Sequence, residues 1–157
     1  MFKICNIGCG HMARSGHGPA FKKYAQTRPD TILAACCDLN QERAEWFKEQ
    51  FGFKKAYTDY KLMLAETKPD AVCLISPVDC TAEMAIEILK LGYPLILEKP
   101  PGRNVEETKQ LVKAAVESGV TVRVAFNRRY TPLLVALKEF TKKECVRNIT
   151  YQMYRKD

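Results

Sequence analysis

The sequence has 157 residues, 46% apolar and 27% charged, with a formal net charge of +7, and this length suits one soluble globular domain. The longest apolar run, residues 71–77, is far shorter than the roughly 18 residues of a membrane span. Met1 is followed by no long apolar stretch and no cleavage site, so we expect no signal peptide. The excess charge lies after residue 119, where 9 basic and 3 acidic residues are mixed with apolar ones. We therefore expect a cytoplasmic protein that binds neither membrane nor nucleic acid.

The first 126 residues alternate short strand-like runs with segments of helical period. The expected strands are residues 3–7, 31–37, 56–57, 71–76, 94–97 and 120–126, and the expected helices between the later strands are 41–51, 59–66, 79–91 and 105–117. Gly52, Gly92 and Gly119 follow three of these helices as expected C-terminal stops. This βαβα order predicts an α/β fold, a doubly wound parallel sheet of the Rossmann type with helices on both faces.

After Phe126 the alternation ends. Residues 131–141 predict one more helix, and residues 148–155 alternate polar and apolar side chains like a strand with one exposed face. We expect a dinucleotide-binding domain at 1–126 and, at 127–157, a hinge followed by the first helix and strand of a second α+β domain.

The segment Gly8-Cys9-Gly10-His11-Met12-Ala13 directly follows the first predicted strand and opens a helix. Gly8 permits a tight turn, Gly10 lets the backbone approach a pyrophosphate, and the small Ala13 allows close packing of helix and strand. Such a glycine turn in this context predicts a dinucleotide site.

Asp38 ends the second predicted strand, 28 residues after Gly10. Its carboxylate is placed to accept hydrogen bonds from an adenosine ribose and to repel a 2′-phosphate, which favours NAD over NADP. Gly16, Gly18 and Pro19 predict an interrupted first helix, which explains the long spacing. The alternative is a structural turn with a helix-capping aspartate. Arg43 lies one turn into the next helix, where it softens the preference for NAD, stacks on the adenine or is simply a surface residue.

A second group of polar residues, Glu98-Lys99-Pro100-Pro101, follows the fifth predicted strand. Carboxyl ends of strands in such a sheet face the ligand crevice, where a lysine can orient a substrate hydroxyl and share its proton. The two prolines restrict Lys99 to extended geometry and permit a cis bond. The alternative is a solvated Glu–Lys pair before a turn.

The chain has seven cysteines and two histidines. Cys5, Cys36, Cys37 and Cys73 lie in strand-like runs, and no Cys-x-x-Cys pair occurs, so we expect buried reduced thiols and no metal site. His11 is expected to contribute backbone to the turn, and His17 to serve packing or capping.

Several motifs together resemble the glucose-fructose oxidoreductase / inositol dehydrogenase / MocA family (Gfo/Idh/MocA). They are the glycine turn, Cys37-Asp38, Lys68-Pro69-Asp70-Ala71-Val72, Ser76-Pro77, Glu98-Lys99-Pro100 and Phe126-Asn127-Arg128-Arg129-Tyr130, in that order. The resemblance implies an NAD(P)-dependent oxidoreductase that transfers a hydride to or from a sugar, polyol or related substrate. It also implies a homo-oligomer in the full-length form.

The same resemblance assigns roles to residues. Lys99 is the implied catalytic lysine, Glu98 helps to place the nicotinamide, Ser76 and Pro77 line the groove, and Asn127 and Arg129 lie near the hinge. The complete set of expected cofactor-binding residues is Gly8, Gly10, His11, Met12, Ala13, Asp38, Arg43, Ser76, Pro77, Glu98, Lys99 and Asn127.

Members of this family usually exceed 300 residues, so the chain looks like a cofactor-binding half that is inactive alone. Two alternatives stay open: a non-catalytic NAD-binding sensor or regulatory module, and an NAD-dependent glycosidase of the same family. The residues that would select a substrate lie beyond this sequence.

Overall fold

The computed structural model describes residues 1–142, 145–150 and 152. The chain divides into two compact units, Met1–Ala125 and Phe126–Asp157. The sequence places the boundary one residue later, after residue 126. The functions expected of the two parts stay predictions.

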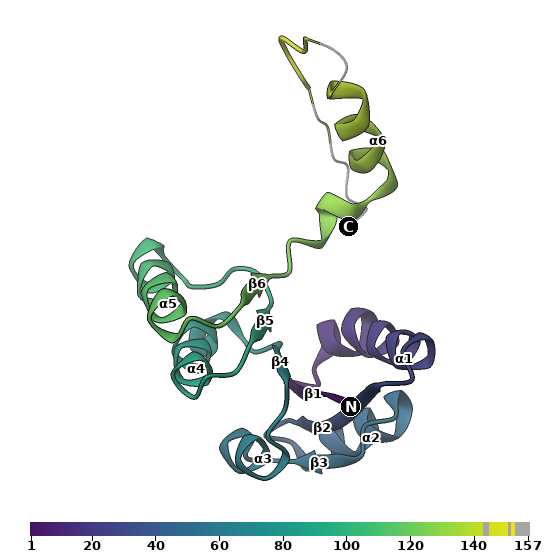
Figure 1. Ribbon diagram of the computed structural model, residues 1–157, viewed down its shortest axis with the longest axis vertical. Coiled ribbons are helices and arrows are strands. Elements are labelled where there is room, and N and C mark those ends of the chain that lie inside the picture. The colour runs from purple at the N-terminus through teal and green to yellow at the C-terminus, as the bar shows by residue number, and fades with distance from the viewer. Residues whose placement is uncertain (143–144, 151, 153–157) are drawn as a thin grey trace. The chain divides into compact units, whose positions relative to one another are not determined.

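The first unit is built on six parallel strands in the order β3-β2-β1-β4-β5-β6. They are β1 (Phe2–Ile7), β2 (Thr31–Cys37), β3 (Lys55–Tyr57), β4 (Ala71–Leu74), β5 (Leu95–Leu97) and β6 (Val122–Val124). The chain runs outward from β1 through β2 to β3, then returns to β4 on the other side of β1 (Figure 1). The order thus reverses between β1 and β4, where open α/β sheets form their ligand crevice. The predicted doubly wound sheet is confirmed.

Helices cover both faces of this sheet. α1 (Gly18–Thr27) and α2 (Gln41–Phe51) lie on one face, and α3 (Tyr60–Thr67), α4 (Val78–Lys90) and α5 (Val105–Ser118) lie on the other. Strand β4 shows why both faces are apolar: Val72 and Leu74 pack with the second group of helices, whereas Cys73 packs with the first. Successive side chains of a strand point to opposite faces, so a fully covered strand needs a continuous apolar run.

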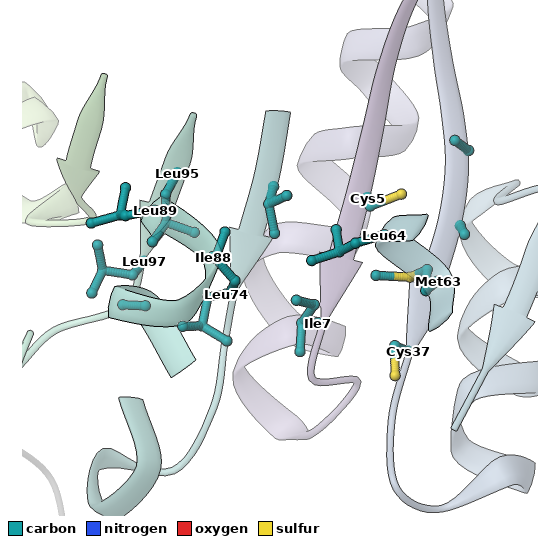
Figure 2. Packing of buried hydrophobic residues seen from close by; sticks show 14 of the residues in the cluster. Cys5, Ile7, Cys37, Met63, Leu64, Leu74, Ile88, Leu89, Leu95 and Leu97 are labelled. Carbon is teal, nitrogen blue, oxygen red and sulfur yellow. The ribbon is translucent and has the colours of Figure 1, made fainter. Parts of the chain in front are cut away.

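The larger core lies between the sheet and the helices α3, α4 and α5. Figure 2 shows side chains from three elements meeting there: Leu74 from β4, Ile88 and Leu89 from α4, and Leu95 and Leu97 from β5. On the opposite face, Phe47 of α2 is fully buried among aromatic and aliphatic side chains.

The helix ends follow their sequence signals. The side chains of Asn40, Asp59 and Asn104 accept hydrogen bonds from the first-turn N–H groups of α2, α3 and α5. Gly52 and Gly119 end α2 and α5 in the left-handed conformation. Short polar side chains and glycine thus fix where these helices begin and end.

The predicted interruption of the first helix takes the form of a π-helical turn, η1 (Ala13–His17), which continues directly into α1. Some strands are shorter than predicted. β6 contains only three residues of the expected 120–126, and β4 ends at Leu74 because the following residues turn toward α4.

The second unit contains a 3₁₀ turn, η2 (Asn127–Tyr130), and α6 (Pro132–Thr141), which confirms the helix predicted at 131–141. Half of the predicted strand at 148–155 lies outside the described residues. Its described positions, 148–150 and 152, belong to no helix or strand. Within the described part of the chain, every helix is too short or too polar to cross a membrane.

Candidate cofactor-binding site

A groove of about 600 Å³ lies across the carboxyl ends of β1, β2, β4 and β5, within the size range of small-molecule sites. It is lined by Ile7, Gly8, Gly10, His11, Met12, Cys37, Asp38, Leu39, Asn40, Arg43, Thr58, Tyr60, Ile75, Ser76, Pro77, Cys80, Met84, Glu98 and Lys99. The structure therefore brings together most of the residues predicted to hold a cofactor. Two are elsewhere: Ala13 is fully buried in the core, and Asn127 belongs to the second unit.

Gly8 is required by the turn at the end of β1. Its φ is +92°, and a Cβ at this position would lie 2.0 Å from the carbonyl oxygen of Ile75. Its N–H donates to the carbonyl of Cys37, and its own carbonyl accepts from the buried amide of Asn6. The first glycine thus fits tightly between the ends of β2 and β4, and any side chain would force these strands apart.

Gly10 has the opposite surroundings. A Cβ here would have no heavy atom within 4 Å, and its φ is not positive. Gly10 also lines the groove, so the free space above its backbone belongs to the groove. The helix that follows begins with N–H groups that lack intrahelical partners, a favourable place for an anion. This opening has the form that a pyrophosphate needs, and a single methyl group would narrow it.

The Asp38 carboxylate lines the groove at the end of β2. One oxygen accepts from the N–H of Cys9 at 2.8 Å, and the other accepts from the N–H of Asn40 at 3.0 Å. The alternative of a helix-capping aspartate is wrong, because Asn40 caps α2. Asp38 instead holds the glycine turn against β2 while its charge faces the groove. An Nη of Arg43 lies 3.5 Å from the carboxylate.

The opposite end of the groove is formed by the ends of β4 and β5. Ser76 and Pro77 follow β4, and the Ser76 hydroxyl shares a 2.8 Å hydrogen bond with that of Thr81 in α4. Glu98 and Lys99 follow β5; Glu98 is buried and Lys99 is exposed. The peptide bond between Lys99 and Pro100 is cis, one of the two forms that the sequence permits.

His17 has a role that the sequence did not predict. Its side chain caps no helix. Its Nε2 instead lies 2.8 Å from Oε1 of Glu98. The expected capping is therefore wrong, whereas the expected packing is confirmed, because the His17 ring lies 6.2 Å from that of Phe21 between centroids. No local pattern could have shown the contact with Glu98, because the two residues are 81 positions apart.

The four cysteines predicted to be buried, Cys5, Cys36, Cys37 and Cys73, are buried and free. Burial, followed by nearby negative charge, raises the pKa of Cys37 to about 12, and burial raises the pKa of Cys5. The thiols of Cys5 and Cys37 therefore stay protonated at neutral pH and act as small apolar side chains.

Comparison with known proteins identifies the family. The family model GFO_IDH_MocA, described as an oxidoreductase family with an NAD-binding Rossmann fold, matches residues 2–126. The chain belongs to the Gfo/Idh/MocA oxidoreductase family. The resemblance inferred from the motifs is thereby confirmed.

Relatives in the Gfo/Idh/MocA family include sugar and polyol dehydrogenases. Inositol 2-dehydrogenase of Rubrobacter xylanophilus is 34% identical over 135 residues, which cover 85% of this chain and 39% of that protein. D-glucoside 3-dehydrogenase of Escherichia coli is 29% identical over 128 residues, which cover 82% of this chain and 35% of that protein. The chain therefore spans less than half the length of these relatives.

Solved structures of the family have the same fold. An NAD-binding oxidoreductase from Klebsiella pneumoniae matches 90% of this chain and 39% of its own, with a TM-score of 0.80 and 29% identity. The WlbA dehydrogenase from Chromobacterium violaceum, in complex with NADH and UDP-GlcNAcA, matches 90% of this chain and 40% of its own, with a TM-score of 0.82 and 26% identity. The first unit is thus a dinucleotide-binding domain of this family.

Proposed function

We propose that the chain is the cofactor-binding part of an NAD-dependent dehydrogenase that acts on a sugar, a polyol or a related substrate. The observation that supports this most is the continuity of the groove. It runs from the Asp38 carboxylate, past the open backbone at Gly10, to Lys99. A ribose-binding acid, an anion-binding turn and a catalytic lysine thus lie along one surface in the order that a dinucleotide and its substrate require.

The preference for NAD rests on Asp38. Its carboxylate presents negative charge to the groove, and this charge opposes a 2′-phosphate on the adenosine ribose. Arg43 offers a positive charge at the same end, but its side chain lies beside the Asp38 carboxylate and is partly neutralised by it. The pair therefore favours NAD while leaving weak binding of NADP.

Lys99 is the proposed catalytic residue. Its side chain is exposed at the carboxyl end of β5, where it can reach a substrate in the groove as well as solvent. There Nζ holds the hydroxyl or carbonyl oxygen of the substrate. It accepts the hydroxyl proton when the alcohol is oxidised and gives a proton to the oxygen when the carbonyl is reduced, and it exchanges that proton with water. The bound dinucleotide supplies the hydride acceptor or donor. A sensor needs only the groove, whereas a lysine beside its end favours an enzyme.

Calorimetric titration of the 157-residue chain with NADH and NADPH tests the proposal. We expect NADH to bind in the micromolar range and NADPH about tenfold more weakly. Binding of both dinucleotides no better than millimolar would overturn the assignment. With NAD and a panel of sugars and polyols, we expect residues 1–157 alone to form no NADH, because they span less than half the length of the dehydrogenases that they resemble. Formation of NADH by residues 1–157 alone would refute this expectation.

A further inference from the structure

A chain of hydrogen bonds lies behind the lysine end of the groove. Nε2 of His17 is 2.8 Å from Oε1 of Glu98, and the other Glu98 oxygen accepts from the backbone N–H of Lys99 at 3.1 Å. The side chains of His17 and Glu98 are 18% and 11% exposed. Glu98 lines the groove, but His17 does not. The histidine thus contacts the groove only through the glutamate.

The proton positions along this chain follow from the chemistry of the groups. An ionised carboxylate only accepts hydrogen bonds, so Nε2 of His17 carries a hydrogen and donates a hydrogen bond to Glu98. On the other side of the ring, Nδ1 lies 3.7 Å from the Cys73 sulfur. Burial, and then the charge of Glu98, raises the pKa of the Cys73 thiol, so it stays S–H and donates to Nδ1. The thiol thereby favours the ring tautomer that bonds Glu98.

The π-helical turn directs His17 toward Glu98. His17 is the last residue of η1, and the next N–H, that of Gly18, donates to the carbonyl of Ala13 five positions back. A π turn contains one residue more than an α turn, so it rotates the following side chains by about 100° around the helix axis. His17 reaches the end of β5 because of this extra residue.

Cysteine, histidine and glutamate in this order also occur in nucleophilic catalysis, but Cys73 is unsuited to it. Its side chain is 1% exposed, and its raised pKa keeps it as a thiol. A catalytic cysteine needs the reverse, an accessible sulfur with a lowered pKa. The arrangement instead holds the carboxylate of Glu98 in a fixed orientation.

We propose that His17 is a positioning residue for the nicotinamide end of the cofactor, acting through Glu98 and the Lys99 backbone. The proposal rests on the proposed function, because it assumes that a nicotinamide dinucleotide occupies the groove. It predicts that replacing His17 weakens binding of the nicotinamide half of the ligand and leaves binding of the adenosine half unchanged.

Two substitutions separate this role from simple packing. His17→Gln keeps an N–H donor near the position of Nε2, and His17→Leu keeps a similar volume without a donor. Each variant of the 157-residue chain is titrated by calorimetry with NADH and with ADP-ribose, which lacks the nicotinamide. If the leucine variant does not fold, His17→Ala replaces it.

We expect His17→Leu to bind NADH about tenfold more weakly than the wild type and ADP-ribose within about twofold, with His17→Gln close to wild type for both. Equal weakening of both ligands would show a structural effect and overturn the proposal, as would unchanged NADH binding or a glutamine variant as weak as leucine. If the wild type binds neither ligand, the proposed function itself fails.

Discussion

Gly10→Ala should separate cofactor binding from folding. The added methyl group would have no heavy atom within 4 Å, and the φ of Gly10 is not positive. Replacing glycine where alanine fits without strain stabilises a protein by about 0.4–1 kcal/mol, because the unfolded chain loses freedom. For a chain of this size, that raises the melting temperature by up to about 4 °C.

The same methyl group lies where a pyrophosphate would approach the turn. It would lengthen the hydrogen bonds from the backbone to the phosphate oxygens, and bonds to charged groups contribute about 1.5–3 kcal/mol each. Loss of one such bond corresponds to roughly tenfold to hundredfold weaker NADH binding. Thermal unfolding and calorimetry on the same preparation measure both quantities.

Gly8→Ala is the matched control, because it should damage the fold. Its Cβ would lie 2.0 Å from the Ile75 carbonyl oxygen, at a φ of +92°. Positive φ alone costs about 1–2 kcal/mol, and the clash adds to it, so we expect a loss of about 3 kcal/mol or more. If Gly10→Ala binds NADH as tightly as the wild type, the pyrophosphate does not lie at this turn and the interpretation is refuted.

Three further substitutions test other parts of the structure. Asp38→Asn keeps an acceptor for the glycine turn but removes the charge, so the affinity for NADPH relative to NADH should rise about tenfold in paired titrations. Phe47→Ala removes a fully buried ring and should cost about 3–5 kcal/mol in urea unfolding. The pKa of Glu87 is lowered by hydrogen bonds from Tyr60 and then Lys61. Glu87→Gln should therefore lower stability at neutral pH and flatten its loss in acid.

Each of these has a result that would contradict it. An unchanged ratio of affinities in Asp38→Asn would remove this carboxylate from cofactor selection. Leu39→Ala is the control for Phe47→Ala, because the Leu39 side chain is 94% exposed, and it should change the free energy of unfolding by less than about 0.5 kcal/mol. If Phe47→Ala lost no more stability than Leu39→Ala, the assigned core would be contradicted. Because the pKa of Glu87 is lowered in the folded protein, its ionised form stabilises the fold at pH values above the ordinary pKa of 4.5. This stabilisation is lost as the pH falls through the pKa of Glu87 in the folded protein. Parallel acid unfolding curves for Glu87→Gln and the wild type would argue against that coupling.

Most of the fold can be predicted from local patterns in the sequence. The apolar run at β4 and the glycines that end α2 and α5 act within a few residues, so their structure can be predicted without tertiary information. The same holds for the turn at Gly8, where the positive φ itself calls for glycine.

Contacts between distant residues could not be predicted in this way. The hydrogen bond from Cys9 to Asp38 and that between His17 and Glu98 depend on how the strand ends are aligned. The glycines at 16 and 18 indicate an interrupted helix, but not that the interruption is a π turn whose extra residue directs His17 toward Glu98. Sequence patterns thus identified the residue types at the groove, whereas the hydrogen bonds that orient them required the folded structure.

The lengths of β3 and β6 have a consequence for assembly. These outermost strands contain three residues each, with Lys55 in one and Arg123 in the other. An incoming strand would gain few backbone hydrogen bonds at either border and would meet a charged side chain, a combination that discourages intermolecular sheet growth. The two edges of the sheet are therefore poor templates for a strand from another molecule.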